Sequence, residues 1–194
     1  MKLSEKKILK KKEQILLSAI TIVNRRGYDG ATMEEIAAEL MMTKGSLYYY
    51  FNNKSDLLYQ CHKLVLAQAT EELEEDLRGE GTAEEIMRKM IGTHINYAVD
   101  EKETFNLIIE PKQMFNPEQI EPVLKLRKHY AGLFDQAIEK GVISGEFHVK
   151  EPIIVRMMIL GAMNWIQQWY NPDGRMAKDE LKQHFADAIM KLLK

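Results

Sequence analysis

The sequence predicts an all-α protein. Apolar residues recur at helical spacing along most of the 194 residues, and several helix starts are marked by capping boxes or by proline. No stretch alternates between apolar and polar residues for long enough to predict a sheet. With 45% hydrophobic residues, the chain can bury a sizeable core. We expect about nine helices, divided between a domain of residues 1–54 and a domain of residues 55–194.

The first helix is expected before Gly27, which together with Gly30 ends it. Its apolar stripe comprises Ile8, Ile15, Leu16, Ala19 and Val23. The other face carries the basic residues Lys6, Lys7, Lys10, Lys11 and Lys12. Such a lysine-rich face is either an ordinary solvated surface or a surface that contacts an anionic partner.

Two short helices joined by a tight turn should follow. Thr32 is a good N-cap, and Glu35 three residues later completes a capping box. The apolar face of this helix comprises Ile36, Ala37 and Leu40. Met41 and Met42 then form the turn, and Thr43 caps the next helix.

The rest of the chain reads as helix after helix. These helices are expected over residues 55–77, 82–99, 116–140, 152–170 and 177–194, with a shorter apolar segment over 105–109. Thr82 with Glu85 forms a second capping box, and Gly141 should close the helix that begins near Pro117.

The last two helices have more apolar surface than one small bundle can bury. Residues 153–166 are apolar nearly all the way round the helix, and the final helix has a separate apolar stripe. We interpret the excess as a homodimer interface in which each subunit contributes two helices. The residues predicted to form it are Ile159, Met163, Phe185, Ile189 and Leu192.

The helix after Thr43 combines a small polar first turn with three consecutive tyrosines. Leu47 and Phe51 are four residues apart, so both can anchor one face of this helix to a core. The opposite faces then present Lys44, Ser46, Tyr48 and Tyr49. The major groove of double-stranded DNA admits such a helix, and this spacing is typical of a helix-turn-helix.

The strings GSLYYYF (residues 45–51) and KSDLL (residues 54–58) resemble the DNA-binding signature of the TetR family of transcriptional regulators. Tyr50 departs from that signature at a position where histidine is common. The resemblance implies that Thr32, Tyr50 and Lys54 hold backbone phosphates. It also implies that Thr43, Lys44, Ser46, Tyr48 and Tyr49 lie in the groove, and that Gly45 matters because it has no side chain. A palindromic operator and a homodimer are further expectations.

Charge is divided unevenly along the chain. Residues 1–54 contain ten Lys or Arg and six Asp or Glu, a net charge of +4, whereas residues 55–194 carry a net charge of −6. The basic part therefore coincides with the predicted DNA-binding domain. The resemblance favours contact between the N-terminal lysines and phosphates or the minor groove.

Methionines and aromatic residues are frequent in the second domain, either as ordinary core or as the lining of an adaptable apolar cavity. The family resemblance favours a small-molecule effector that releases DNA. The ligand-binding residues predicted on this basis are Tyr97, Phe105, Met114, Phe115, Arg127, Tyr130, Phe134, Met158 and Trp165.

The strings GAMNW (residues 161–165) and WYNPDG (residues 169–174) are similar to TetR-type regulators of fatty-acid degradation that respond to acyl-CoA. This similarity implies an acyl-CoA effector whose phosphorylated head lies near Arg127, Lys128 or Arg156. A different apolar ligand or drug is the alternative, and residues 169–174 could simply build a turn.

Other classes of function have little support in the sequence. The five histidines are scattered without metal-ligand spacing, no phosphate loop or nucleophile elbow is present, and no cofactor or catalytic residue is predicted. Cys61 is the single cysteine and is expected to be a small apolar side chain on a helix. No targeting or membrane segment is recognisable, so we expect a cytoplasmic protein. A helical adaptor that binds only proteins remains the rival, and it would show no salt-dependent affinity for DNA.

Overall fold

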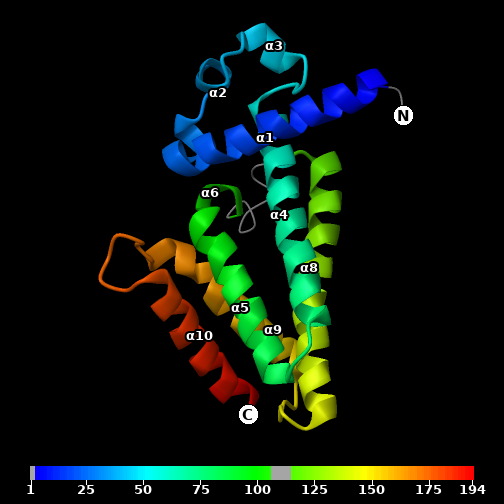
Figure 1. Ribbon diagram of the computed structural model, residues 1–194, viewed down its shortest axis with the longest axis vertical. Helices are drawn as coiled ribbons and strands as arrows, with labels where there is room; N and C mark the ends of the chain where they lie inside the picture. The colour runs from blue at the N-terminus through cyan, green and yellow to red at the C-terminus, as the bar shows by residue number, and fades with distance from the viewer. Residues whose placement is uncertain (1–2, 106–114) are drawn as a thin grey trace. The chain divides into compact units, whose positions relative to one another are not determined.

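The computed structural model of this protein describes residues 3–105 and 115–194 (Figure 1). Within these residues the protein is helical and has no strand, which confirms the all-α prediction. The described helices are α1 (Leu3–Gly30), α2 (Met33–Glu39), α3 (Lys44–Tyr48), α4 (Lys54–Arg78), α5 (Ala83–Asp100), α6 (Lys102–Phe105), α8 (Pro117–Ser144), α9 (Pro152–Trp169) and α10 (Lys178–Leu193).

The chain forms two compact units. The first comprises residues 1–65 and 101–121, and the second comprises residues 66–100 and 122–194. Helices α4 and α8 each contribute turns to both units. The expected division at residue 54 is a division by function and stays a prediction.

Helix α1 is the long element of the first unit. Ile15, Leu16, Ala19 and Val23 are buried, as the apolar stripe predicts, but Ile8 is 41% exposed. The prediction was wrong for Ile8 because the first turns of α1 lie outside the packed part of the helix. Backbone angles leave the helical region at Gly27, with φ at 75°, close to the predicted end.

The turn between α2 and α3 follows the predicted capping. Thr32 Oγ1 accepts from the backbone N–H of Glu35, and the Glu35 carboxylate accepts in return from the N–H of Thr32. Met41 has a φ of 52°, the left-handed conformation that lets the chain reverse there. Leu47 and Phe51 are 0% and 1% exposed, which confirms that they anchor α3.

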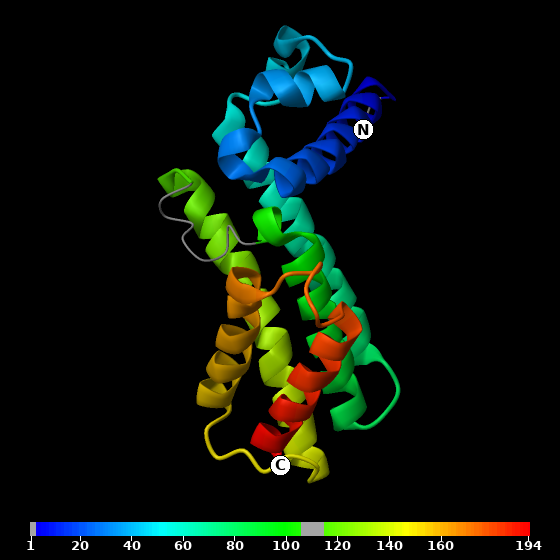
Figure 2. The same cartoon turned by 90° about the vertical axis from the view of Figure 1, so that its left-hand side faces the viewer.

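The second unit is built around α5, which packs against both α9 and α10. Figure 2 shows α9 and α10 side by side toward the viewer. Helix α8 does not close at Gly141 as predicted but continues to Ser144, where Gly145 takes a φ of 77°. Gly141 is instead a packing position, because a Cβ there would lie 2.0 Å from the Phe147 ring.

Candidate nucleic-acid interface and ligand site

Helix α3 presents a polar and aromatic face to solvent. Leu47 is buried beneath it, whereas Tyr48 and Tyr49 are 42% and 71% exposed. Thr43, Lys44, Gly45 and Ser46 are exposed as well. The residues predicted to enter the groove therefore lie together on one accessible surface, and contact with DNA itself stays a prediction.

The polar groups of this surface are already paired with one another. Ser46 donates its backbone N–H to Thr43 Oγ1 at 3.1 Å, and the two hydroxyl oxygens are 2.8 Å apart. Lys44 forms an ion pair with Glu34 of α2, and this hydrogen bond lowers the pKa of the Glu34 carboxyl group. An anionic partner of Lys44 would therefore have to compete with Glu34.

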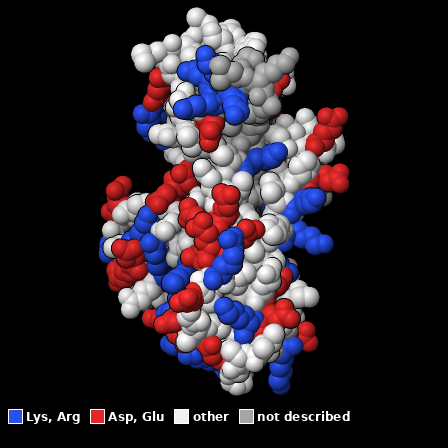
Figure 3. Space-filling model, turned by 45° about the vertical axis from the view of Figure 1, so that its right-hand side comes forward, with Lys and Arg blue, Asp and Glu red and all other residues white. Residues whose placement is uncertain are grey.

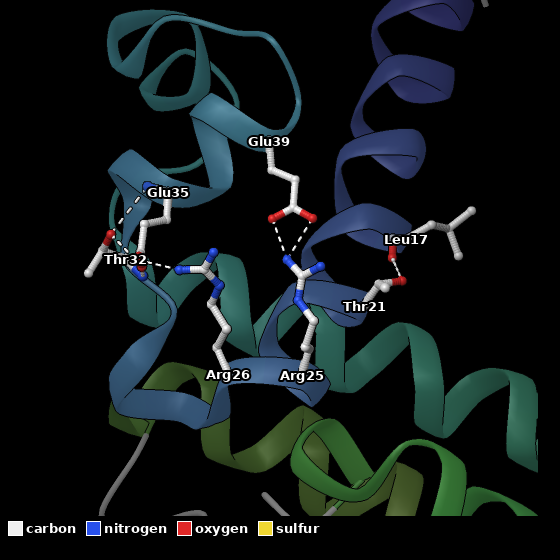
Figure 4. A network of polar contacts seen from close by, with 7 residues as sticks. All are labelled: Leu17, Thr21, Arg25, Arg26, Thr32, Glu35 and Glu39. Atoms are coloured by element: carbon white, nitrogen blue, oxygen red, sulfur yellow. Dashed lines mark hydrogen bonds and ion pairs between the residues drawn. The ribbon is translucent and has the colours of Figure 1, made fainter.

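Two arginines of α1 are tied to α2 (Figure 4). Arg25 forms an ion pair with Glu39 at 2.6 Å, and Arg26 forms one with Glu35 at 2.5 Å. The Thr32 hydroxyl, predicted to hold a phosphate, donates to Glu35 at 3.0 Å in this structure. These contacts fix α2 relative to α1 in the first unit and neutralise two of its cations.

The remaining predicted phosphate contacts are half-buried. Tyr50 packs edge-on against Tyr49 with the ring centroids 5.0 Å apart, and Lys54 begins α4. Gly45 has no internal reason to be glycine, because the nearest atom to an added Cβ is Thr43 Oγ1 at 4.0 Å. A glycine in a helix is unfavourable relative to alanine by about 0.5–1 kcal/mol, so a close external partner would account for it.

Lysines gather on α1. Lys6, Lys7, Lys10 and Lys11 are exposed, and Lys12 lies with its Nζ 5.2 Å from the centroid of the Phe51 ring. Figure 3 shows a group of Lys and Arg side chains in the upper part of the view, whereas both signs of charge are interspersed over the rest of the face drawn. The first unit therefore has the basic surface that phosphate binding requires.

The structure divides the predicted ligand-binding residues between the two units. Phe105 and Phe115 are buried in the first unit, and Met114 lies outside the described residues. Tyr97, Arg127, Tyr130 and Phe134 belong to the second unit, where Tyr130 and Phe134 are buried with ring centroids 6.0 Å apart. Met158 and Trp165 are 53% and 61% exposed on α9.

Tyr130 belongs to a buried polar group that the sequence did not reveal. Its hydroxyl lies 2.9 Å from Nδ1 of His94, and the side chain of Asn164 is a second hydrogen-bonding neighbour of the imidazole. Burial lowers the pKa of His94 to about 3 and raises the pKa of Tyr130 well above its usual value. Both side chains are therefore uncharged at neutral pH.

Gln167 is a second buried polar residue that the sequence analysis did not identify. Its position four residues after the apolar Met163, on the same side of the helix, could have indicated burial. It is 2% exposed, and neither its amide nitrogen nor its amide oxygen has a hydrogen-bond partner among the described residues. Burying such a group unpaired costs about 1–3 kcal/mol.

Arg127, on α8, is partly desolvated, which lowers its pKa to about 10 and leaves it protonated at neutral pH.

The predicted dimer contacts differ in how far they are exposed. Ile159, Met163 and Ile189 are 1%, 0% and 6% exposed, so they pack within the second unit, and their part in a dimer stays a prediction. Phe185 is half-buried, and Leu192 is 40% exposed. The apolar face that α9 does expose comprises Ile153, Ile154, Met157, Met158, Trp165 and Trp169. The sequence showed the excess of apolar residues but could not show which side of α9 faces its own subunit.

Three observations bear on other classes of function. No group of His, Cys, Asp and Glu residues suited to a metal ion occurs among residues 3–105 and 115–194. In the same part of the chain, no helix is long and apolar enough to cross a membrane. Cys61 is buried as predicted, and burial raises the pKa of its thiol.

An exposed helix anchored after a tight turn, in the same unit as a lysine-rich helix, is the arrangement of a helix-turn-helix domain. The chain belongs to the TetR family of bacterial regulatory proteins. Residues 15–61 match the family described as bacterial regulatory proteins, tetR family, and residues 80–193 match the tetracyclin repressor-like C-terminal domain. The family consists of transcriptional regulators and not of enzymes.

Known proteins resemble the chain over most of its length. The fatty acid metabolism regulator protein of Bacillus subtilis is 30% identical over 155 residues, which is 78% of each chain. The crystal structure of FadR from Bacillus subtilis with stearoyl-CoA has a TM-score of 0.74 at 23% identity and covers 94% of this chain and 99% of that one. AibR with isovaleryl coenzyme A and operator DNA has a TM-score of 0.76 at 24% identity, covering 94% and 97%. The two structures support the fold.

Proposed function

We propose that this regulator is a homodimeric repressor that binds a palindromic operator and releases it when an acyl-CoA binds its C-terminal domain. The observation that supports operator binding most directly is the exposed face of α3, with Lys44, Ser46 and Tyr49 held outward by buried Leu47. Tyrosine and serine hydroxyls and a lysine ammonium are suitable donors to base edges and phosphates.

Gly45 supports a close approach to DNA. A side chain at this position would meet open space within the protein, so its absence is best explained by an external surface. In this proposal Lys44 exchanges Glu34 for DNA, while Thr32, Tyr50 and Lys54 flank the groove near the backbone.

Homodimerisation is proposed through the exposed apolar face of α9, extended by Leu192 of α10. Met157 and Trp165 are 63% and 61% exposed, and a contiguous apolar surface of this kind is costly to leave in water. A two-fold axis would place two α3 helices in successive major grooves about 34–36 Å apart, which predicts a palindromic operator.

Two observations support an acyl-CoA effector: the ligands and roles of similar proteins, and the buried aromatic and cationic side chains of the second unit. The relative from Bacillus subtilis is named for fatty acid metabolism, and the two structures hold stearoyl-CoA and isovaleryl coenzyme A. The second unit combines a buried aromatic pair, Tyr130 and Phe134, with the partly desolvated cation Arg127. An apolar ligand or drug of another kind is the alternative effector.

Release of the operator follows from thermodynamic linkage between the binding of DNA and the binding of acyl-CoA. If acyl-CoA binds better to a conformation that cannot engage the operator, it lowers the affinity for DNA by the same factor by which DNA lowers the affinity for acyl-CoA. A coupling of about 1–3 kcal/mol corresponds to a change of about 5-fold to 150-fold.

The test is a fluorescence titration of the protein into a labelled duplex from the region upstream of its own gene. We expect an affinity that falls steeply as salt rises, and a further loss when stearoyl-CoA or isovaleryl-CoA is added but not with free coenzyme A. No salt-dependent binding to any duplex would favour the protein-binding adaptor instead. Operator binding that neither acyl-CoA changes would remove the acyl-CoA effector and leave the DNA-binding function standing.

A further inference from the structure

The interior of the second unit contains hydrogen-bonding groups that apolar packing alone does not require. His94 lies on α5, Tyr130 on α8, and Asn164 and Gln167 on α9. We refer to these four residues as the His94 cluster. Helix α5 packs against α9, and Gln167 is one helical turn from Asn164, so the two amides lie on neighbouring positions of the α9 surface.

Gln167 is the member whose chemistry is unexplained. Its side chain is 2% exposed, yet both the donor and the acceptor of its amide lack a hydrogen-bond partner among the described residues. Buried amides are nearly always paired, so this amide is expected to bond to something that enters the interior. A water molecule or a polar group of a ligand could do so.

The charge state of the cluster limits what that group can be. His94 and Tyr130 are both neutral at physiological pH, and the remaining two members are amides. A carboxylate buried there would have no cation in the cluster to balance it, which is strongly unfavourable. A plain hydrocarbon would leave the Gln167 amide unpaired.

We infer that the His94 cluster, through Gln167, recognises an uncharged carbonyl group of the effector, namely the thioester carbonyl of an acyl-CoA. This inference rests on the proposed acyl-CoA effector and adds the part of the ligand that is read and the residue that reads it. The Gln167 amide nitrogen donates to the thioester oxygen, and the other three members of the cluster are uncharged, as suits a neutral carbonyl group.

The test compares two matched ligands by calorimetry on the full-length protein. Stearoyl-CoA has the thioester carbonyl, and S-octadecyl-CoA is the thioether that lacks it; isovaleryl-CoA and S-isopentyl-CoA form a short-chain pair. We expect the wild-type protein to bind a thioester about tenfold more tightly than the matching thioether, the effect of one hydrogen bond.

Two variants test whether Gln167 causes the tighter binding of the thioester. Gln167→Leu should bind thioester and thioether equally, at the affinity that the wild-type protein has for the thioether. Gln168→Leu is the matched control, because Gln168 is the next residue of α9 but exposed, and it should behave as wild type. In the absence of ligand, Gln167→Leu should melt at a higher temperature, because it removes an unpaired buried amide.

The outcomes are distinguishable. A wild-type protein that binds both members of a pair equally, or a Gln167→Leu protein that keeps the preference, overturns the inference and leaves the acyl-CoA effector standing. A wild-type protein that binds neither thioester overturns both. If Gln167→Leu does not fold, Gln167→Met takes its place, with the same expected loss of the thioester preference.

Discussion

Asn24 on α1 is hydrogen-bonded to Glu101, 77 residues further along the chain, with 2.5 Å between Asn24 Nδ2 and Glu101 Oε2. The side-chain oxygen of Asn24, Oδ1, also accepts from the backbone N–H groups of Glu103 and Thr104 at 3.0 and 3.2 Å. These N–H groups belong to the first turn of α6 and have no partner within that helix. Asn24 therefore caps α6 from another helix, and His62 of α4 reaches the same turn through Thr104 O at 2.8 Å.

Replacing Asn24 should weaken the first unit. Asn24→Ala leaves two backbone donors of α6 unpaired, and we expect the free energy of unfolding to fall by about 1–3 kcal/mol in urea titrations. Thr21→Ala is the control on the same helix, since Thr21 is exposed and its hydroxyl donates to Leu17 O one turn earlier. An Asn24→Ala protein as stable as this control would mean that solvent satisfies those donors.

Gly45→Ala should separate stability from DNA binding. The added Cβ meets nothing closer than 4.0 Å within the protein, so the stability should be unchanged or slightly higher. Operator affinity should fall about tenfold, the effect of about 1.4 kcal/mol lost where DNA comes close. Gly132→Ala in α8 also enters open space and should leave DNA binding intact. Equal operator affinities for the two variants would argue against a close approach at α3.

The lysines of α1 should contribute to DNA affinity without regard to sequence. Replacing Lys10 and Lys11 together by methionine should reduce the slope of log affinity against log salt by about 2, because each phosphate contact contributes about 0.9. Operator and random duplexes should be weakened alike. The matched control replaces Lys125 and Lys128, which are exposed on α8. An unchanged slope in the α1 variant would show that these lysines form an ordinary solvated surface.

Met157→Asp should dissociate the dimer. Met157 is 63% exposed on α9, so within one subunit the change costs little, but a carboxylate buried at an interface has no partner. Sedimentation equilibrium should give the mass of a monomer, and affinity for the complete operator should fall with it. Ile143→Asp, at a 79% exposed site near the end of α8, should remain dimeric. A Met157→Asp dimer would place the interface elsewhere.

His94 should make the protein less stable in mild acid. Its pKa is about 3 when folded and near 6.5 when unfolded, so between these values the unfolded state binds the extra proton. Stability due to His94 is therefore complete above about pH 6.5 and is lost as the pH falls toward 3. From pH 6.5 to pH 5 the loss should be about 2 kcal/mol. Urea unfolding of His94→Gln should show a correspondingly flatter dependence, whereas exposed His148→Gln should match wild type.

Much of the fold could be predicted because its signals are local. The capping pairs Thr32–Glu35 and Thr82–Glu85 mark helix starts through contacts three residues apart, and Leu47 and Phe51 share a face because they are four apart. The family signature in residues 45–58 is likewise continuous in the sequence. For these features, the order of residues alone was enough to locate helices and the exposed surface of α3.

What the tertiary structure decided are the relationships between distant residues. Only packing shows that α9 buries Ile159 and Met163 and leaves Met157 and Trp165 in solvent, because an almost uniformly apolar helix gives no periodic signal of its orientation. Gly141, expected to end a helix, instead makes room for Phe147. The contacts of Asn24 with α6, and of His94 with Tyr130, join residues 36 or more positions apart. Such pairs are set by which helices meet in space, which no local pattern specifies.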